Sequence, residues 1–317
     1  MTPPLTASQR AALHQAFGGR VQENAPLAPL TSARLGGAAD YLLPVRSADE
    51  LAETVTRLWA LEIPFVLLGG GSNLLVSDDG VREVVVLNRA KQIRFEMQSE
   101  PPAVRAESGA NFGRMSRQAA QRGLSGLEWA AGIPGTVGGA VYGNAGAHGG
   151  EVAAQLQMAE ILHKVQGGAQ RSTWTAEHFQ FGYRTSALKR GAAAVVLSAR
   201  FVLRPDAPEN IRARMDEFLA HRRRTQPRGA SLGSIFKNPP GDYAGRLIEA
   251  AGLKGTRIGG AEISRQHANF FINDADAAAS DVMALIQLAR RTVAEQFGIE
   301  LALEIEVIGD WELETDK

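Results

Sequence analysis

Apolar residues recur at helical spacing in six segments of the chain, and each segment predicts an amphipathic helix. The clearest lies near the C-terminus, where one helical face is apolar throughout and Gly298 follows as a C-terminal cap. Its apolar positions are Val282, Leu285, Ile286, Ala289, Val293 and Phe297. The other predicted helices cover residues 7–17, 48–62, 111–122, 211–223 and 242–251. Pro64 follows the second of these, where proline ends a helical pattern.

Short apolar runs bounded by glycine, proline or aspartate predict strands. They cover residues 65–68, 74–76, 84–87, 156–165, 195–203 and 267–272, with further strands on either side of Pro101 and Pro102. Residues 301–308 alternate, which predicts a strand with Leu303 and Ile305 on one face and Glu304 and Glu306 on the other. Without a chemical role, both glutamates belong on the solvated face of an edge strand, since glutamate is mostly exposed.

Composition narrows the class of protein. The chain has 317 residues, of which 44% are apolar, so it is long enough for two or three domains with a sizeable core. Lysine plus arginine equals aspartate plus glutamate at 34 each, which argues against a general nucleic-acid binder. The absence of cysteine excludes disulfides, thiolate metal sites, iron–sulfur clusters and a cysteinyl cofactor linkage.

No targeting or membrane segment is visible in the sequence. Residues 1–18 lack the basic region and apolar core of a secretory signal, and no apolar run reaches the ~18 residues of a membrane span. We therefore expect a cytoplasmic protein with no membrane or nucleic-acid partner. The sequence gives no sign of an obligate protein partner or of a metal site.

Two glycine-rich segments are candidates for a phosphate-binding site. Residues 69–73 follow a predicted strand, and residues 132–140 form the second cluster. The first is not a GxGxxG fingerprint, because Leu74 and an extended segment follow it, and the second lacks the GK[ST] of a P-loop. Taken singly, each is equally well explained as a tight turn. Together they favour a dinucleotide diphosphate held by backbone N–H groups in a less common nucleotide fold.

The run Gly233-Ser234-Ile235-Phe236-Lys237-Asn238-Pro239 is the strongest candidate for chemistry. No histidine lies within ten residues of Ser234, which disfavours a triad-type nucleophile. A hydroxyl near the cation of Lys237 is better suited to donate a proton, because a nearby cation favours the deprotonated form. Local sequence also allows a turn serine that bonds its own backbone.

Seven segments, taken in order, carry a resemblance to one enzyme family. They are Thr31–Gly37 (TSARLGG), Leu68–Asn73 (LGGGSN), Ala131–Ala140 (AGIPGTVGGA), Phe181–Ser186 (FGYRTS), Gly233–Pro239 (GSIFKNP), His267–Phe270 (HANF) and Leu303–Val307 (LEIEV). From about residue 30 to residue 310, the chain resembles the UDP-N-acetylenolpyruvoylglucosamine reductase (MurB) family. The resemblance implies an α+β fold: two FAD-binding subdomains of the vanillyl-alcohol-oxidase/PCMH type, then a C-terminal α+β substrate domain. The implied ranges are an N-terminal lead at 1–30, subdomains at 31–92 and 93–205, and the substrate domain at 206–317, with Pro205 and Pro208 at the last boundary.

The resemblance also implies an activity in peptidoglycan precursor synthesis. NADPH reduces a non-covalent FAD, and the enolpyruvyl ether of UDP-N-acetylglucosamine then takes hydride from flavin N5 at C3 and a proton at C2, giving UDP-N-acetylmuramate. The implied partners are therefore a UDP-sugar and NADPH. The implied cofactor-binding residues are Arg34, Gly69, Gly70, Gly71, Ser72, Asn73, Gly132, Ile133, Pro134, Gly135, Thr136, Gly138, Gly139 and Ala140. The implied substrate contacts are Tyr183, Lys237 and Asn238.

Three side chains match the catalytic positions of the family, namely Arg184, Ser234 and Glu306. By this match Arg184 holds the enolpyruvyl carboxylate in its guanidinium fork, although without the family it reads as a surface arginine. Ser234 is the implied proton donor to C2. Strand alternation does not choose between Glu304 and Glu306, and only the motif selects Glu306. Because two carboxylates repel each other, we hypothesise that Glu306 is neutral and donates a hydrogen bond to the developing charge.

One departure concerns the region after Tyr183. Some members of the family carry an extra loop there with a substrate-gripping tyrosine, but no tyrosine lies between Tyr183 and Pro205. The chain is therefore similar to the shorter-loop subclass. Two alternatives to the reductase stay open: a flavin-dependent sugar or alcohol oxidase on the same scaffold, and a catalytically silent nucleotide-sugar binder.

Overall fold

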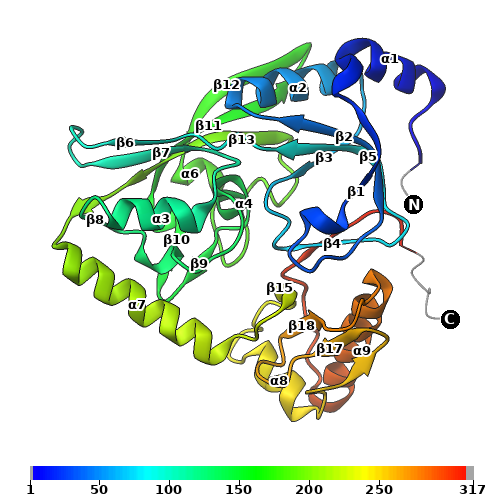
Figure 1. Cartoon of the computed structure of the whole chain (residues 1–317), viewed down its shortest axis with the longest axis vertical. Coiled ribbons are helices and arrows are strands. Elements are labelled where there is room, and N and C mark those ends of the chain that lie inside the picture. Colours follow the sequence, from blue (N-terminus) through cyan, green and yellow to red (C-terminus); the bar gives the residue numbers. More distant parts are fainter. Residues whose placement is uncertain (1–2, 312–317) are drawn as a thin grey trace.

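Three sheets organise the protein in the computed structural model, which describes residues 3–311 (Figure 1). The first two lie in the upper part of the view and the third lies in the lower right part, beyond the end of the long helix α7 (Pro208–Thr225). Residues 1–2 and 312–317 of the predicted ranges 1–30 and 206–317 lie outside the described residues. None of the helices in the described part of the chain is long and apolar enough to cross a membrane.

The first sheet has the order β1-β2-β5-β3. Its strands are β1 (Gln22–Pro26), β2 (Ala38–Val45), β5 (Val81–Asn88) and β3 (Phe65–Leu68). Helix α1 (Ala7–Phe17) has the predicted bounds, and helix α2 (Ala48–Ala60) ends two residues before the prediction. The predicted stripe of α2 is confirmed, since Leu51, Val55 and Leu58 are fully buried. Because β2 and β3 both run parallel to β5, the chain must cross over between them, and α2 supplies that crossover.

The second sheet is antiparallel throughout, with the order β12-β11-β13-β7-β6. Its strands are β12 (Gly168–Thr175), β11 (Leu156–Val165), β13 (Ala194–Val202), β7 (Ala103–Glu107) and β6 (Ile93–Glu96). Helices α3 (Phe112–Ala120) and α4 (Val137–Tyr142) contribute to the core under this sheet. Shorter elements nearby are α5 (Val152–Gln155), α6 (Ala176–Phe179), β8 (Leu124–Ser125), β9 (Gly146–Ala147), β10 (Gly150–Glu151) and β14 (Arg204–Pro205).

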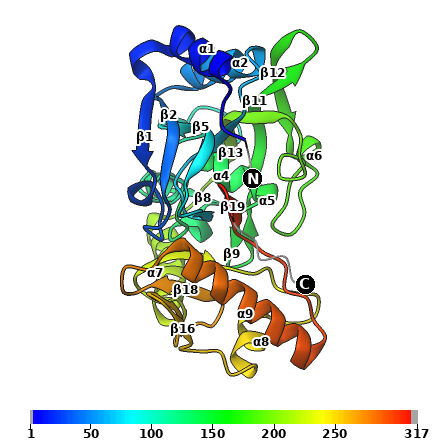
Figure 2. The same cartoon turned by 90° about the vertical axis from the view of Figure 1, so that its right-hand side faces the viewer.

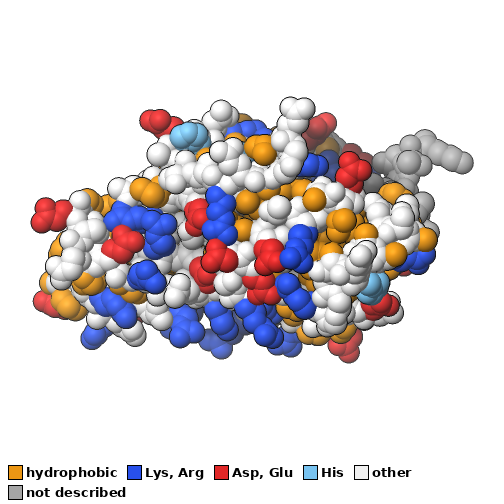
Figure 3. Space-filling model, turned by 90° about the horizontal axis from the view of Figure 1, so that it is seen from above, with side chains coloured by type: hydrophobic (Ala, Val, Ile, Leu, Met, Phe, Trp, Pro, Cys, Tyr) orange, Lys and Arg blue, Asp and Glu red, His pale blue; other side chains and the backbone are white. Residues whose placement is uncertain are grey.

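The surface seen from the α1 and α2 end carries positive and negative side chains side by side (Figure 3). Ion pairs account for part of this pattern, such as Arg171 with Asp49 at 2.7 Å and Arg57 with Glu53 at 2.6 Å. Along the lower edge of this view, however, Lys and Arg side chains lie next to one another with few acidic side chains between them.

The third sheet, with the order β15-β18-β17-β16, belongs to the lower part of Figure 1. Its strands are β15 (Ala230–Ser234), β18 (Phe270–Asn273), β17 (Ala261–Ile263) and β16 (Arg257–Ile258), and its helices are α8 (Ala244–Ala250) and α9 (Ala279–Phe297). The predicted face of α9 is buried from Val282 to Val293, whereas Phe297 is 37% exposed. Gly298 ends α9 in the left-handed region, at φ 66°, as predicted.

Two predicted strands differ from the structure. The strand predicted at 267–272 begins only at Phe270, because the backbone turns at His267, where Phe270 N donates to His267 O. The strand predicted at 301–308 is confined to β19 (Glu306–Ile308), and it does not lie at the edge of the third sheet. Instead β19 pairs in parallel with β4 (Leu74–Val76), so the chain leaves the lower part and returns to the upper part, as Figure 2 also shows. Alternation gives the faces of a strand but not its partner, which explains the error.

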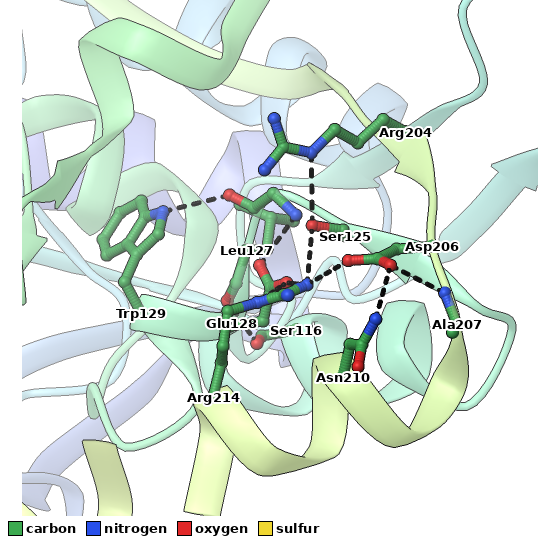
Figure 4. Close-up of polar contacts among 11 residues, drawn as sticks. Ser116, Ser125, Leu127, Glu128, Trp129, Arg204, Asp206, Ala207, Asn210 and Arg214 are labelled. Carbon is green, nitrogen blue, oxygen red and sulfur yellow. Dashed lines mark hydrogen bonds and ion pairs between the residues drawn. The ribbon is translucent and has the colours of Figure 1, made fainter. Parts of the chain in front are cut away.

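Helix α7 connects the upper and lower parts, and its first half is fixed by a polar network (Figure 4). Arg214 of α7 donates to Glu128 at 2.7 Å and lies 2.5 Å from Asp206. The Glu128 side chain is 9% exposed and also accepts from Gly126 N at 2.7 Å. Burial alone would raise the pKa of Glu128, but the hydrogen bonds from Arg214 and Gly126 outweigh it and hold that pKa below its ordinary value.

Candidate functional site

The structure brings the two glycine segments into contact. The first (69–73) follows β3, and the second (132–140) leads into α4. A Cβ atom on Gly70 would lie 2.8 Å from Gly135 Cα, and one on Gly135 would lie 2.6 Å from Ser72 Oγ. The two loops therefore pack backbone against backbone, at a distance that only glycine allows. Gly71 and Gly135 also have positive φ angles, 58° and 99°, which glycine adopts without strain.

The first loop presents unused hydrogen-bond donors. Among the described residues, the backbone N–H groups of Gly70, Gly71, Ser72 and Asn73 donate no hydrogen bond. Backbone donors left without a protein partner need water or a ligand. A concave backbone with several free N–H groups suits an anion such as a diphosphate. The loops therefore fit the diphosphate of a dinucleotide cofactor.

Other predicted cofactor residues lie around these loops. Thr136 caps α4, because its side chain accepts from Gly139 N at 3.4 Å. The segment that contains Arg34 adjoins the first loop, since Ser32 N donates to Gly71 O at 2.9 Å; the Arg34 side chain itself is exposed. Ile133, Pro134, Gly138 and Ala140 belong to the second loop and the start of α4. The sequence also predicts that the basic run 221–224 lies near the nucleotide entrance, and within it the side chain of Arg222 lies against Gly132, with its pKa lowered by burial.

The segment Leu303–Glu306 is the point where the remaining motifs meet, and we call it the hub segment. Glu304 N donates to Ile235 O at 2.8 Å, beside Ser234. Asn73 Nδ2 donates to Glu304 O at 3.1 Å, and Glu306 N donates to Asn73 O at 2.9 Å. Backbone hydrogen bonds thus tie the first glycine loop and the serine motif to the same four residues.

Arg184 reaches the hub segment from the FGYRTS motif. Its Nε donates to Glu304 Oε1 at 2.7 Å, and one terminal nitrogen donates to Gly146 O at 3.0 Å. Arg184 adopts φ 54°, a strained conformation for a bulky residue that is often found at functional sites. The ring of Tyr183 lies 5.3 Å from the guanidinium carbon, and its hydroxyl accepts from Asn238 N at 3.4 Å. Two predicted substrate residues therefore lie next to the predicted catalytic arginine.

Glu306 has a cation as its neighbour. Lys189 Nζ lies 2.7 Å from Glu306 Oε1, and their side chains are 15% and 37% exposed. A neutral Glu306, as hypothesised from the sequence, would leave the Lys189 ammonium without this charged partner. Burial, together with the charge of Glu306, raises the pKa of Tyr142 to about 12, so this phenol keeps its proton.

Ser234 ends β15 at an irregular point of the sheet. The pairing register of β15 with β18 shifts between Ser231 and Ser234, and Gly233 has φ 78°. Among the described residues, the Ser234 hydroxyl makes no hydrogen bond, so the alternative of a turn serine that bonds its own backbone is not observed. The hydroxyl is thus available to a ligand.

The residues after Ser234 are held by buried Asn269. Its side chain accepts from Phe236 N at 2.9 Å and donates to Phe236 O at 2.8 Å. Lys237 N donates to Ala302 O, which adds a further link to the C-terminal segment. Asn238 Oδ1 accepts from Ala244 N at the start of α8, so this oxygen already has a partner.

Comparison with known proteins identifies the family to which this chain belongs. Residues 39–170 match the family model of an FAD binding domain, and residues 226–308 match that of the UDP-N-acetylenolpyruvoylglucosamine reductase C-terminal domain. The UDP-N-acetylenolpyruvoylglucosamine reductase of Chloroflexus aggregans is 44% identical over 91% of this chain and 97% of its own length. The chain belongs to the UDP-N-acetylenolpyruvoylglucosamine reductase (MurB) family.

Other MurB relatives agree. The reductase of Geobacillus thermodenitrificans is 40% identical over 92% of this chain and 93% of its own length. The crystal structure of the MurB reductase from Thermus caldophilus superposes with a TM-score of 0.77, at 38% identity, over 91% of this chain and 98% of that one. The predicted fold class, an FAD-binding region followed by a C-terminal α+β domain, is confirmed.

Sequence reasoning missed two side chains of this MurB site. It considered Glu304 only as an alternative to Glu306 and did not consider Lys189. In the structure each glutamate has its own cation. Arg184 of the FGYRTS motif pairs with Glu304, and Lys189, three residues after the motif, pairs with Glu306. A signal was present, because two acids on one strand face need two cations if they are half-buried. The sequence did not show which cations come near them.

Proposed function

We propose that this chain reduces the enolpyruvyl ether of UDP-N-acetylglucosamine to UDP-N-acetylmuramate, with non-covalent FAD as cofactor and NADPH as electron donor. The reaction belongs to peptidoglycan precursor synthesis. The observation that carries the proposal is the hub segment, where the glycine loops, Arg184, the Ser234 motif and Glu306 are joined by short contacts. Family membership supports the same activity.

In this proposal, residues 31–92 and 93–205 hold the cofactor, and residues 206–317 hold the UDP-sugar. The loops 69–73 and 132–140 bind the FAD diphosphate through backbone N–H groups, and Arg34 lies on an adjoining segment. When bound, the flavin supplies the hydride that it has received from NADPH. Asn73, the last residue of the first loop, bonds directly to Glu304 and Glu306, so the residues that would hold the cofactor are joined to the hub segment.

The side chains then divide the work at the substrate. Glu304 holds Arg184 by Nε, which leaves guanidinium N–H groups to bind the enolpyruvyl carboxylate. Ser234 gives its proton to C2 as hydride arrives at C3, so the double bond is reduced and charge is balanced. Tyr183, Lys237 and Asn238 contact the substrate, with the Lys237 ammonium suited to a phosphate. Glu306 is the last residue of the hub segment and is the third member of the proposed catalytic set.

The test follows the two half-reactions separately without oxygen. NADPH should bleach the bound flavin in both the wild type and Ser234→Ala, because that step needs no proton donor at C2. Adding the enolpyruvyl nucleotide should reoxidise the wild type in one turnover, whereas Ser234→Ala should be slower by about 10²–10⁴-fold. Ser231→Ala is the matched control, since Ser231 lies in the same strand β15.

Three results would overturn the proposal. A wild-type protein that never reoxidises with the enolpyruvyl nucleotide would refute the activity. Normal turnover by Ser234→Ala would refute the proton donor. Oxygen consumption with simple sugars, without enolpyruvyl reduction, would favour an oxidase on the same scaffold.

A further inference from the structure

We propose that Lys189 is a positioning residue of this site: it holds the Glu306 side chain and the Glu304 backbone in place and balances the charge of the site that the substrate enters. The inference rests on the proposed function, and it adds to Arg184, Ser234 and Glu306 a residue that acts through one of them.

The backbone of Lys189 is anchored by the buried side chain of Ser186. Lys189 N donates to Ser186 Oγ at 3.3 Å, and Ser186 Oγ donates to Tyr142 O at 2.6 Å. Ser186 is fully buried. The turn that follows Arg184 is therefore anchored to the end of α4, and Lys189 projects from a rigid base.

The ammonium group of Lys189 reaches the hub segment at two points. Nζ donates to Glu304 O at 3.2 Å and lies 2.7 Å from Glu306 Oε1. Glu306 Oε1 is buried and makes no hydrogen bond of normal geometry, so it is held by charge rather than by a directed bond. A carboxylate held in this way depends on its cation, since burial without the cation would disfavour the charged form.

The charged groups around Glu306 balance one another. Arg184 and Lys189 supply two positive charges, and Glu304 and Glu306 supply two negative charges. Tyr142, the other titratable group facing Glu306, stays protonated, because its pKa is raised to about 12. Asn73, which bonds this segment from the first glycine loop, is neutral. The cluster therefore has no net charge before the substrate arrives.

The reaction brings one more negative charge into this cluster, the carboxylate of the enolpyruvyl group. With Lys189 present, that carboxylate meets a neutral cluster that contains the Arg184 fork. Without Lys189, the cluster carries a net negative charge, and the substrate carboxylate is repelled. The nicotinamide of NADPH brings no carboxylate, so loss of Lys189 should affect the substrate step and spare flavin reduction.

The first test measures binding and does not depend on turnover. Lys189→Met should weaken binding of UDP-N-acetylmuramate, which carries the carboxylate, at least tenfold, which corresponds to about 1.4 kcal/mol. Binding of UDP-N-acetylglucosamine, which lacks that carboxylate, should change less than twofold. Calorimetry with oxidised holoprotein gives both values. Lys189→Arg should restore most of the affinity, and Arg190→Met is the matched control because Arg190 is exposed and bonds Gln180 O instead.

The second test uses anaerobic half-reactions. In Lys189→Met, reduction by NADPH should match the wild type, while reoxidation by the enolpyruvyl nucleotide should be at least tenfold slower. Adding Lys189→Met to Glu306→Gln should lower the reoxidation rate little further, since the two residues act as one unit.

A purely structural role for Lys189 predicts other results. Equal weakening of the binding of both nucleotides, equal slowing of both half-reactions, or an additive double variant would each overturn the inference. If the wild type reduces no enolpyruvyl nucleotide, the proposed function falls and this inference falls with it. If the wild type reduces the enolpyruvyl nucleotide and Lys189→Met performs as well as Arg190→Met, the proposed function stands and this inference fails.

Discussion

Replacing Gly70 by alanine tests whether the contact between the two glycine loops forms the cofactor site. The added Cβ would lie 2.8 Å from Gly135 Cα, whereas ordinary van der Waals contact begins at 3.4 Å. The loops must therefore separate by about 0.6 Å, the difference between these distances. No side chain can rotate away to relieve the clash, because the nearest atoms all belong to the Gly135 backbone. Backbone strain at position 70 is not the cause, since Gly70 is not among the positive-φ residues.

The expected cost is that of overpacking, about 1–3 kcal/mol. The cofactor-bound form needs both loops in place, so this free-energy cost should reduce FAD affinity by about tenfold to a hundredfold. Titration of flavin-free protein with FAD, followed by fluorescence, measures the change. Gly168→Ala is the control, because a Cβ there meets nothing within 4 Å. FAD binding by Gly70→Ala within twofold of the wild type would refute this account of the site.

Three further predictions concern stability and orientation. Arg214→Met should lower the free energy of unfolding, measured in urea, by about 3–5 kcal/mol, because buried Glu128 loses its cation. Adding Glu128→Met should recover much of that stability. A double variant less stable than Arg214→Met would contradict the prediction. Glu304→Leu should slow reoxidation by the enolpyruvyl nucleotide about tenfold, whereas Glu304→Gln, which keeps an acceptor for Arg184 Nε, should retain most of the rate. Burial lowers the pKa of His267 from its ordinary 6.5, so the folded state binds fewer protons than the unfolded state, and stability should fall as the pH drops below about 6.5. Melting temperatures at about pH 5 and pH 8 should differ less in His267→Phe than in the wild type.

Local patterns predicted the elements well because their causes are local. The apolar face of α9 and its cap at Gly298 were both correct, since helical spacing and the left-handed preference of glycine act within a few residues. The two glycine segments were also predicted to act together, and the structure places Gly70 against Gly135. That prediction rested on shared chemistry, not on spacing.

Apart from the strand predicted at 267–272, which a local turn at His267 shortens, the failures involve partners that are distant in sequence. Alternation marked 301–308 as a strand, but only the folded chain shows that β19 pairs with β4. The same limit applies to the glutamates: their positions were clear, while their cations, Arg184 and Lys189, lie more than a hundred residues earlier. Which charges face one another depends on how the sheets pack.

The pairing of β19 with β4 has a consequence for the order of events during synthesis. The hydrogen bonds between Asn73 and the hub segment join positions 231 residues apart, so the later partner is synthesised long after the first glycine loop. A nascent chain that ends before residue 303 contains both glycine loops but lacks the segment that bonds the first of them. We therefore expect flavin to be captured only once the hub segment is available, and ribosome-bound chains of increasing length should retain labelled FAD only after that segment has emerged.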